Sequence, residues 1–211
     1  IALTGALPVP LNSFGLQQEL MSNIEDIQPS MMICDADRYQ RVKEVLPNSG
    51  LKTVVVDGNG GDIEWQALIA ANPVALDAPV LQPQDSALIL FTSGATSRAK
   101  GVESTHQAVC QAIFNIDFIS AVAAMTSPNA IAAIMARQLQ PTTLSAVPLF
   151  HVSGLHAQLL INLRHGRRLV FMHRWDAEQA LEIIRKEKIT QFNGAPSMVQ
   201  QLIGLPDFAK P

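Results

Sequence analysis

The chain has 211 residues, of which 48% are hydrophobic and 16% charged, and its formal net charge is −3. This length and apolar content suffice for one large domain or two small ones with a sizeable core. The slightly acidic balance offers no basic surface for nucleic acid, so we expect no nucleic-acid partner.

Short apolar runs alternate with helix-like segments in the first part of the chain. Residues 31–34 and 53–56 predict strands that are covered on both faces, as in a parallel sheet. The segment 36–46 between them predicts a helix that ends at the turn signal of residues 47–50, which completes a βαβ unit. Three prolines within 72–84 predict an extended connection. We therefore expect one α/β lobe over residues 1–78 and a second over 79–211.

The second lobe begins with an apolar strand over residues 87–90, followed by a loop rich in small hydroxyl residues at 92–102. Residues 102–104 predict a short strand. Ser104 and Gln107 fit a capping box that starts a long apolar helix over 108–125. Asn115 and Asp117 lie in the middle of that helix, which favours a buried core helix over a transmembrane one. We expect no integral membrane segment.

The remaining elements continue the alternation. Strands are predicted at 144–147, 169–172 and 189–192, and a helix is predicted at 153–164. Asp176, with Gln179 three residues on, predicts the start of another helix, and Pro196 suits the start of the last one. The expected fold class is α/β, layered, with mostly parallel sheets flanked by helices.

Cys34 and Cys110 are the only cysteines, and both lie in apolar surroundings. Buried free thiols in a reducing compartment fit them better than a disulfide or a metal site. The chain shows no secretory signal, so we expect a cytoplasmic location. Both ends of the sequence look cut, and we expect a piece of a longer protein.

The loop at 92–102 is built to hold phosphate groups. Its Thr, Ser and Gly residues bring backbone N–H groups and hydroxyls close to an anion, and Lys100 adds a positive charge. It is not a Walker loop, because Lys100 precedes Gly101 and Val102 instead of following a glycine. An ordinary polar turn with a solvated lysine fits the loop about as well when it is taken alone.

Three segments in order resemble the adenylate-forming enzymes. Residues 92–102 with Thr105 and His106 are similar to the signature T-S-G-T-T-G-x-P-K-G-V followed by T-H. Residues 147–154 resemble the segment P-L-F-H-x-x-G, and residues 189–198 resemble V-T-x-F-x-G-V-P-T-M. The subgroup that the chain resembles most is the acyl-CoA synthetases, since 174–176 is similar to a basic-aromatic-Asp step in those enzymes.

The resemblance implies part of the N-terminal domain of a two-step ligase. A fatty or aryl acid would attack the α-phosphate of ATP with Mg²⁺ present, and coenzyme A would then displace AMP from the acyl-adenylate. By family position, the nucleotide contacts are Thr92, Ser93, Gly94, Ala95, Thr96, Ser97 and Lys100. His151 and Lys100 are the implied catalytic residues, and His151, Ser153 and Ala157 the implied acid-binding residues.

Other readings of these residues remain open. A core histidine satisfied by a backbone partner is the alternative for His151. Arg174 matches a position that contacts coenzyme A, but it also suits an exposed arginine at a strand end. Trp65 and Trp175 are expected to be packing residues. We expect no metal-ligating residues in this chain, and a homo-oligomer is compatible with the sequence.

Three loop residues depart from the family signature. Ala95 lacks the hydroxyl found there, Ser97 replaces a glycine, and Ala99 replaces a proline. Loss of one donor at a charge-assisted contact weakens binding by roughly 1.5–3 kcal/mol, which leads us to expect reduced nucleotide affinity. The later segments Y-G-x-T-E and T-G-D and the terminal lysine are absent from these 211 residues, which we expect to be inactive alone. The alternative functions are an adenylation domain that loads a carrier protein, a luciferase-like oxidase, and a non-catalytic binding module.

Overall fold

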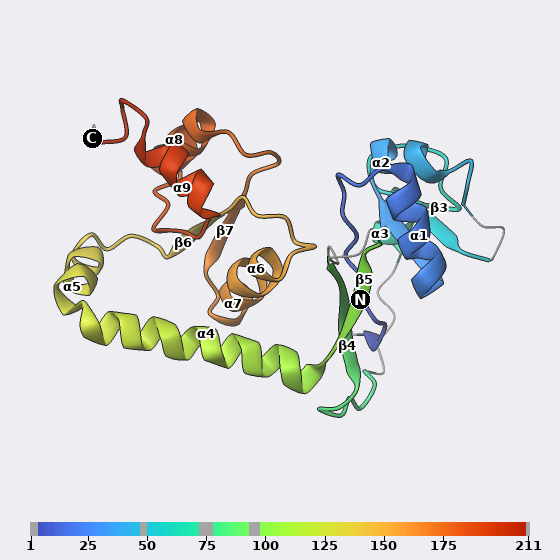
Figure 1. The fold of residues 1–211 in the computed structure, drawn as a ribbon, viewed down its shortest axis with the longest axis horizontal. Helices are drawn as coiled ribbons and strands as arrows, with labels where there is room; N and C mark the ends of the chain where they lie inside the picture. The colour runs from blue at the N-terminus through green and yellow to red at the C-terminus, as the bar shows by residue number, and fades with distance from the viewer. Residues whose placement is uncertain (1–3, 47–49, 72–77, 93–97, 210–211) are drawn as a thin grey trace. The chain divides into compact units, whose positions relative to one another are not determined.

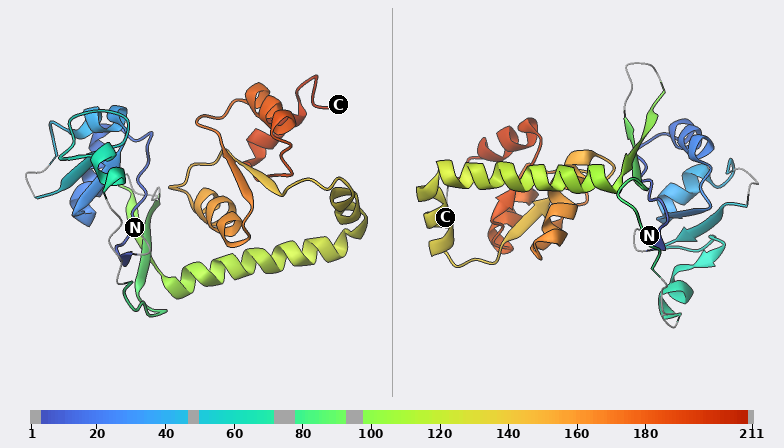
Figure 2. Two further views of the ribbon diagram at one scale, coloured as in Figure 1. Left: turned by 180° about the vertical axis from the view of Figure 1, so that it is seen from behind. Right: turned by 90° about the horizontal axis from the view of Figure 1, so that it is seen from below.

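The computed structural model describes residues 4–46, 50–71, 78–92 and 98–209. The chain divides into two units, Ile1–Ser104 and Thr105–Pro211, and each is described by itself. Figures 1 and 2 show helices against short sheets within both units. The expected division into lobes at residue 78 stays a prediction.

The first unit contains the predicted βαβ arrangement. Helix α1 (Gln17–Ile27) precedes strand β1 (Met31–Cys34), and helix α2 (Ala36–Val42) leads into strand β2 (Lys52–Val55). Strands β1, β2 and β3 (Ile63–Glu64) form a parallel sheet in that order, and helix α3 (Trp65–Ala70) follows β3. The Asp35 side chain caps α2 by accepting a hydrogen bond from the Arg38 amide at 2.8 Å. The helix ends at Val42, four residues earlier than the sequence predicts.

A separate pair of strands ends the first unit. Strands β4 (Ser86–Thr92) and β5 (Lys100–Thr105) form a two-stranded sheet. The extended segment near the N-terminus lies against β4, because the Ile89 amide donates to the Pro8 carbonyl at 3.2 Å. The predicted strands at 87–90 and 102–104 are thus confirmed and each is longer than predicted.

The second unit is built around a three-stranded sheet whose central strand is buried. Strand β6 (Thr142–Ser145) lies between β7 (Arg168–Phe171) and β8 (Gln191–Phe192), and both pairings are parallel. All four β6 residues are buried. Helices α8 (Ala177–Lys186) and α9 (Pro196–Ile203) pack on this sheet through Ala180, Leu181 and Leu202, which surround Leu144. The sheet class expected from the sequence is confirmed.

The N-termini of three helices in the second unit can be compared with the predicted caps. Asp176 accepts a hydrogen bond from the Gln179 amide at 2.8 Å and caps α8, as predicted. Pro196 opens α9, also as predicted. The capping box at Ser104 is wrong by one residue. Thr105 caps α4 (His106–Thr126), because its hydroxyl accepts from the Ala108 amide at 3.2 Å.

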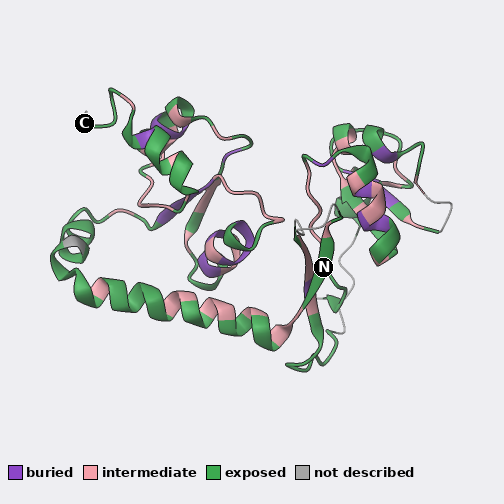
Figure 3. Cartoon of the chain, viewed as in Figure 1, coloured by how far each residue is buried: buried purple, intermediate pink, exposed green. Residues whose placement is uncertain are grey.

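Helix α4 is not the buried core helix that its apolar sequence suggests. None of its residues is buried, and Figure 3 shows it in the exposed and intermediate colours. It continues into α5 (Pro128–Ala136), whose described residues are exposed. Among the described residues, α4 is the one helix long and apolar enough to cross a membrane, judged by length and composition only. The expectation of no membrane segment therefore stays a prediction.

The two thiols differ from each other. Both cysteines are free, as expected, but Cys110 on α4 is exposed, so its predicted burial is wrong. Cys34 at the end of β1 is half-buried. Burial raises the pKa of its thiol to about 11, and the carboxylates of Asp35 and Asp57 add to the shift. At neutral pH Cys34 is therefore a protonated, unreactive thiol.

Candidate functional site

The two ends of the phosphate-loop signature meet at the edge of the β4–β5 sheet. The Thr92 hydroxyl at the end of β4 donates to the backbone carbonyl of Lys100 at the start of β5, at 3.4 Å. Both residues are exposed. Residues 93–97 complete the predicted nucleotide contacts and lie outside the described residues. The sheet therefore brings the Thr92 hydroxyl to the backbone of Lys100 at the base of this loop.

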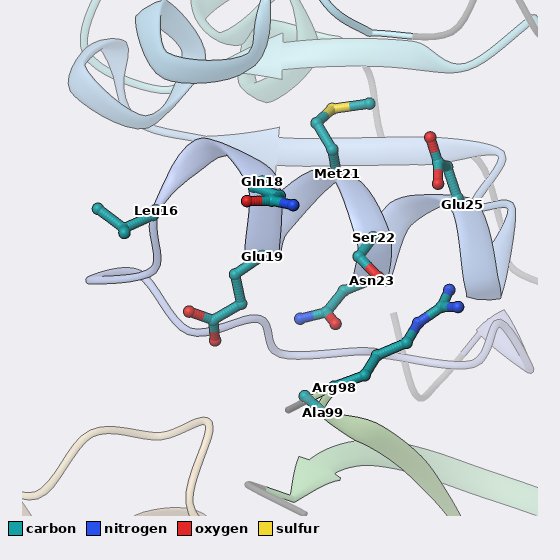
Figure 4. A pocket seen from close by; sticks show the side chains of 9 residues that line it. All are labelled: Leu16, Gln18, Glu19, Met21, Ser22, Asn23, Glu25, Arg98 and Ala99. Carbon is teal, nitrogen blue, oxygen red and sulfur yellow. The ribbon is translucent and has the colours of Figure 1, made fainter. Parts of the chain in front are cut away.

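A hollow of about 710 Å³ lies in the first unit beside α1 (Figure 4). Arg98 and Ala99, which precede β5, line it together with residues of α1. The side chain of Asn23 is buried in this wall, and its Nδ2 atom has no hydrogen-bond partner. The Arg98 guanidinium forms an ion pair with Asp26. Sequence reasoning missed this pair because its two residues are 72 positions apart.

In the second unit, His151 lies in a tight turn between β6 and the next helix. Its backbone amide donates to the Pro148 carbonyl at 3.1 Å, and its carbonyl accepts from the Leu155 amide at 2.9 Å. The imidazole is exposed and tilted against the Phe150 ring, with the centroids 4.5 Å apart. The alternative of a core histidine is therefore wrong. The turn leaves the imidazole accessible to a ligand.

Gly154 makes this turn sterically feasible. A Cβ atom at Gly154 would lie 2.2 Å from the Pro148 carbonyl oxygen and 2.7 Å from that of Val147. Contacts this close are forbidden to any side chain, and only glycine allows the backbone segments to approach. The glycine of the segment P-L-F-H-x-x-G thus has a packing reason in this chain.

The helix predicted over 153–164 is one helical run with a π-helical centre. It comprises α6 (Val152–Gly154), the π-helix η2 (Leu155–Leu160) and α7 (Ile161–Arg164). Short π-helical segments occur frequently at functional sites. Ser153 on α6 is exposed and Ala157 on η2 is half-buried, and both lie in the helical run that follows His151.

Buried polar contacts dock this helical run onto the strands. The Thr143 hydroxyl on β6 donates to Asn162 Oδ1 at 2.9 Å, and Gln158 Nε2 donates to the Asn193 carbonyl beyond β8 at 2.5 Å. His156 is also buried. Burial lowers the pKa of its imidazole, and the nearby Val152 carbonyl opposes this shift. His156 is therefore neutral at pH 7 and acts in packing.

The segment after β7 contains a packing residue, Trp175, next to an exposed charged residue, Arg174. Trp175 stacks on Phe192 with the ring centroids 5.3 Å apart, and its indole N–H donates to Gln201 Oε1 at 2.7 Å. These contacts confirm Trp175 as a packing residue. Arg174 next to it is exposed. Its charge is thus presented to solvent, which suits the predicted contact with a phosphate-bearing molecule.

No group of three or more His, Cys, Asp or Glu side chains in the described part of the chain is arranged to hold a metal ion.

A family model described as AMP-binding enzyme matches residues 1–210. The chain belongs to the AMP-binding enzyme family. The 4-coumarate–CoA ligase 3 of Oryza sativa subsp. japonica is 28% identical over 209 residues, which cover 97% of this chain. The alignment spans 35% of that relative, so this AMP-binding chain represents about a third of its length.

Solved structures agree with the family assignment. One is the o-succinylbenzoate CoA synthetase of Bacillus subtilis in complex with its acyl-adenylate intermediate, which is 25% identical with a TM-score of 0.62. The match covers 95% of this chain and 46% of the synthetase chain. ATP-bound MatB from Rhodopseudomonas palustris is 22% identical with a TM-score of 0.69 over 95% of this chain and 36% of its own. The likeness to MatB shows that this AMP-binding chain has the same fold as the matching part of MatB.

Proposed function

We propose that the full-length protein is an acyl-CoA synthetase that activates a fatty or aryl acid with ATP and then transfers the acyl group to coenzyme A. The observation that carries this proposal is the meeting of Thr92 and Lys100 at the base of the family's phosphate loop. Relatives support it, since one is a 4-coumarate–CoA ligase and another holds an acyl-adenylate. A cytoplasmic location belongs to the same proposal.

The first step requires stabilisation of the negative charge that develops in the transition state. As the carboxylate attacks the α-phosphate, charge accumulates on the departing pyrophosphate, and donors aimed at it lower the barrier. Lys100 supplies a positive charge for this purpose and Thr92 a hydroxyl. Bound Mg²⁺ would supply further neutralisation of the phosphates. His151, with Ser153 and Ala157 in the helical run that follows it, would bind the acid.

The second step needs a place for coenzyme A. The coenzyme carries phosphates, and a guanidinium binds phosphate in a bidentate manner. Arg174 is exposed and its neighbour Trp175 is fixed by stacking on Phe192, so the arginine projects from a rigid segment. We assign it to coenzyme A binding.

The test is ATP–pyrophosphate exchange by the full-length protein with a panel of fatty, aryl and amino acids. Lys100→Gln should slow exchange by about a hundredfold, as loss of a transition-state donor does elsewhere. The control is Lys43→Gln, which removes another exposed lysine from the first unit.

The acceptor is tested in a second assay with coenzyme A or a carrier protein. Exchange followed by formation of a CoA thioester supports the synthetase. Transfer to a carrier protein alone would identify an adenylation domain instead. Absence of exchange with every acid would contradict both and favour a binding module.

A further inference from the structure

Arg98 occupies the position that the phosphate-loop signature leaves open. Only Ala99 separates it from Lys100, so the two cationic residues leave the backbone within about 7 Å of each other. Its guanidinium is paired with the Asp26 carboxylate on α1. The two side chains are 59% and 40% exposed, so the pair is open to solvent.

The last turn of α1 explains why Arg98 is held there. Glu25 and Asp26 lie in this turn, and no basic residue of the helix accompanies them. Carboxylates are unfavourable at the C-terminal end of a helix, where the helix dipole is negative. Arg98 supplies the missing cation from outside the helix. Figure 4 shows its side chain extended toward α1 beside Asn23.

Asp26 is nevertheless a weak partner for Arg98. An exposed carboxylate–guanidinium pair contributes little free energy, because water solvates both groups well and ordering the side chains costs entropy. Phosphate oxygens bind a guanidinium in a bidentate manner and with more charge. A polyphosphate bound at Thr92 and Lys100 would therefore compete successfully with Asp26 for Arg98.

We propose that Arg98 is a further polyphosphate-binding residue, which Asp26 holds until the nucleotide binds. The inference rests on the proposed ATP-binding function of the loop. Asp26 is then a competing anion that lowers the affinity for ATP, and Arg98 adds a cation to a loop in which Ala95 has replaced a hydroxyl residue.

The experiment measures ATP binding by calorimetry and the KM for ATP in pyrophosphate exchange, both with the full-length protein. Arg98→Gln should raise the Kd and KM about tenfold, the effect of losing one charge-assisted contact. Arg98→Lys, which keeps the positive charge, should raise the Kd and KM less than Arg98→Gln does. Asp26→Asn should lower both constants about threefold while kcat stays unchanged. In the Arg98→Gln background, Asp26→Asn should have no effect.

The matched control is Glu25→Gln, which removes the neighbouring carboxylate of the same turn that is not paired with Arg98. It should leave the Kd for ATP unchanged. A lower melting temperature of Asp26→Asn with unchanged ATP affinity would show that the pair only stabilises α1, and would overturn the proposal. An effect of Asp26→Asn on the Kd for ATP in the Arg98→Gln background would also overturn the proposal.

The two proposals fail in different ways. If ATP binding follows the expected pattern but no acid supports exchange, the synthetase proposal is wrong and the role of Arg98 stands. If exchange proceeds and both Arg98 variants bind ATP like the wild type, the role of Arg98 alone is wrong. A wild-type protein that binds no ATP contradicts both.

Discussion

Replacing Thr143 with valine tests how the helical run that follows His151 is held on the sheet. Thr143 is fully buried on β6, and its hydroxyl donates to the side-chain carbonyl of Asn162, which is 1% exposed. Valine has nearly the shape of threonine, so the substitution removes the donor without opening a large cavity. It leaves Asn162 Oδ1 buried without this partner.

The expected loss in the free energy of unfolding is about 1–3 kcal/mol, the desolvation penalty of one unpaired buried acceptor. Urea unfolding followed by tryptophan fluorescence measures it. The chain has two tryptophans, so Trp65→Phe leaves Trp175 as the single reporter, stacked on Phe192 in the second unit. Thr126→Val is the control, because the Thr126 hydroxyl is hydrogen-bonded but exposed. It should cost less than about 0.5 kcal/mol.

A double-mutant cycle with Asn162→Leu separates this contact from other effects. The double variant has neither the Thr143 donor nor the Asn162 Oδ1 acceptor, so it should recover part of the loss. The single Asn162→Leu variant reports the cost of also losing the Asn162 donor to the Gln158 carbonyl. If Thr143→Val costs no more than Thr126→Val, or if the two substitutions are strictly additive, the reasoning about the buried acceptor is wrong.

Two further predictions concern Gly154 and Asp117. Gly154→Ala should displace the His151 turn, since the new Cβ would collide with the Pro148 carbonyl oxygen; we expect loss of pyrophosphate exchange and a lower melting temperature, and an alanine variant that keeps both would refute the steric argument. Asp117 on α4 accepts a hydrogen bond from His165, which with the nearby Arg164 charge lowers the pKa of the carboxyl below its ordinary 3.8, while desolvation opposes the shift. Because the folded-state pKa is depressed, the stabilisation is present above pH 3.8 and is lost as the pH falls through the lower value. Urea unfolding should therefore show Asp117→Asn less stable than the wild type at pH 6, with the difference shrinking in strong acid; a difference independent of pH would contradict this.

Elements with local signals were predictable from the sequence. The Asp176 cap and Pro196 each act within one helical turn, so their effect depends on neighbours in the chain. The apolar runs at 31–34 and 53–56 likewise become paired strands, because strands of a parallel sheet are covered on both faces. Boundaries were less predictable: β6 begins two residues earlier than expected, at Thr142, where threonine hydroxyls rather than apolar side chains fill the buried positions.

Features that depend on distant residues could not be predicted. The exposure of α4 depends on which other elements pack against it, and its apolar composition alone suggests a core helix. The exposed thiol of Cys110 follows from the same misjudgement. The π-helical turn at 155–160 and the contacts of Thr143 with Asn162 also lack a sequence signal. Family motifs located His151, but its accessibility came from the turn formed with Pro148.

The phosphate loop combines substitutions within its own sequence with a contact to a distant residue on α1. Ala95 removes a hydroxyl donor, Ser97 removes the conformational freedom of a glycine, and Ala99 removes the rigidity of a proline, which leads us to expect weak nucleotide binding. Arg98 adds a second cation beside Lys100, but its partner Asp26 reduces the availability of that charge. Under the proposal for Arg98, ATP affinity would be set by a competition between the Asp26 carboxylate on α1 and the polyphosphate. A substitution in a helix outside the signature should therefore strengthen ATP binding, which the loop sequence considered alone would not predict.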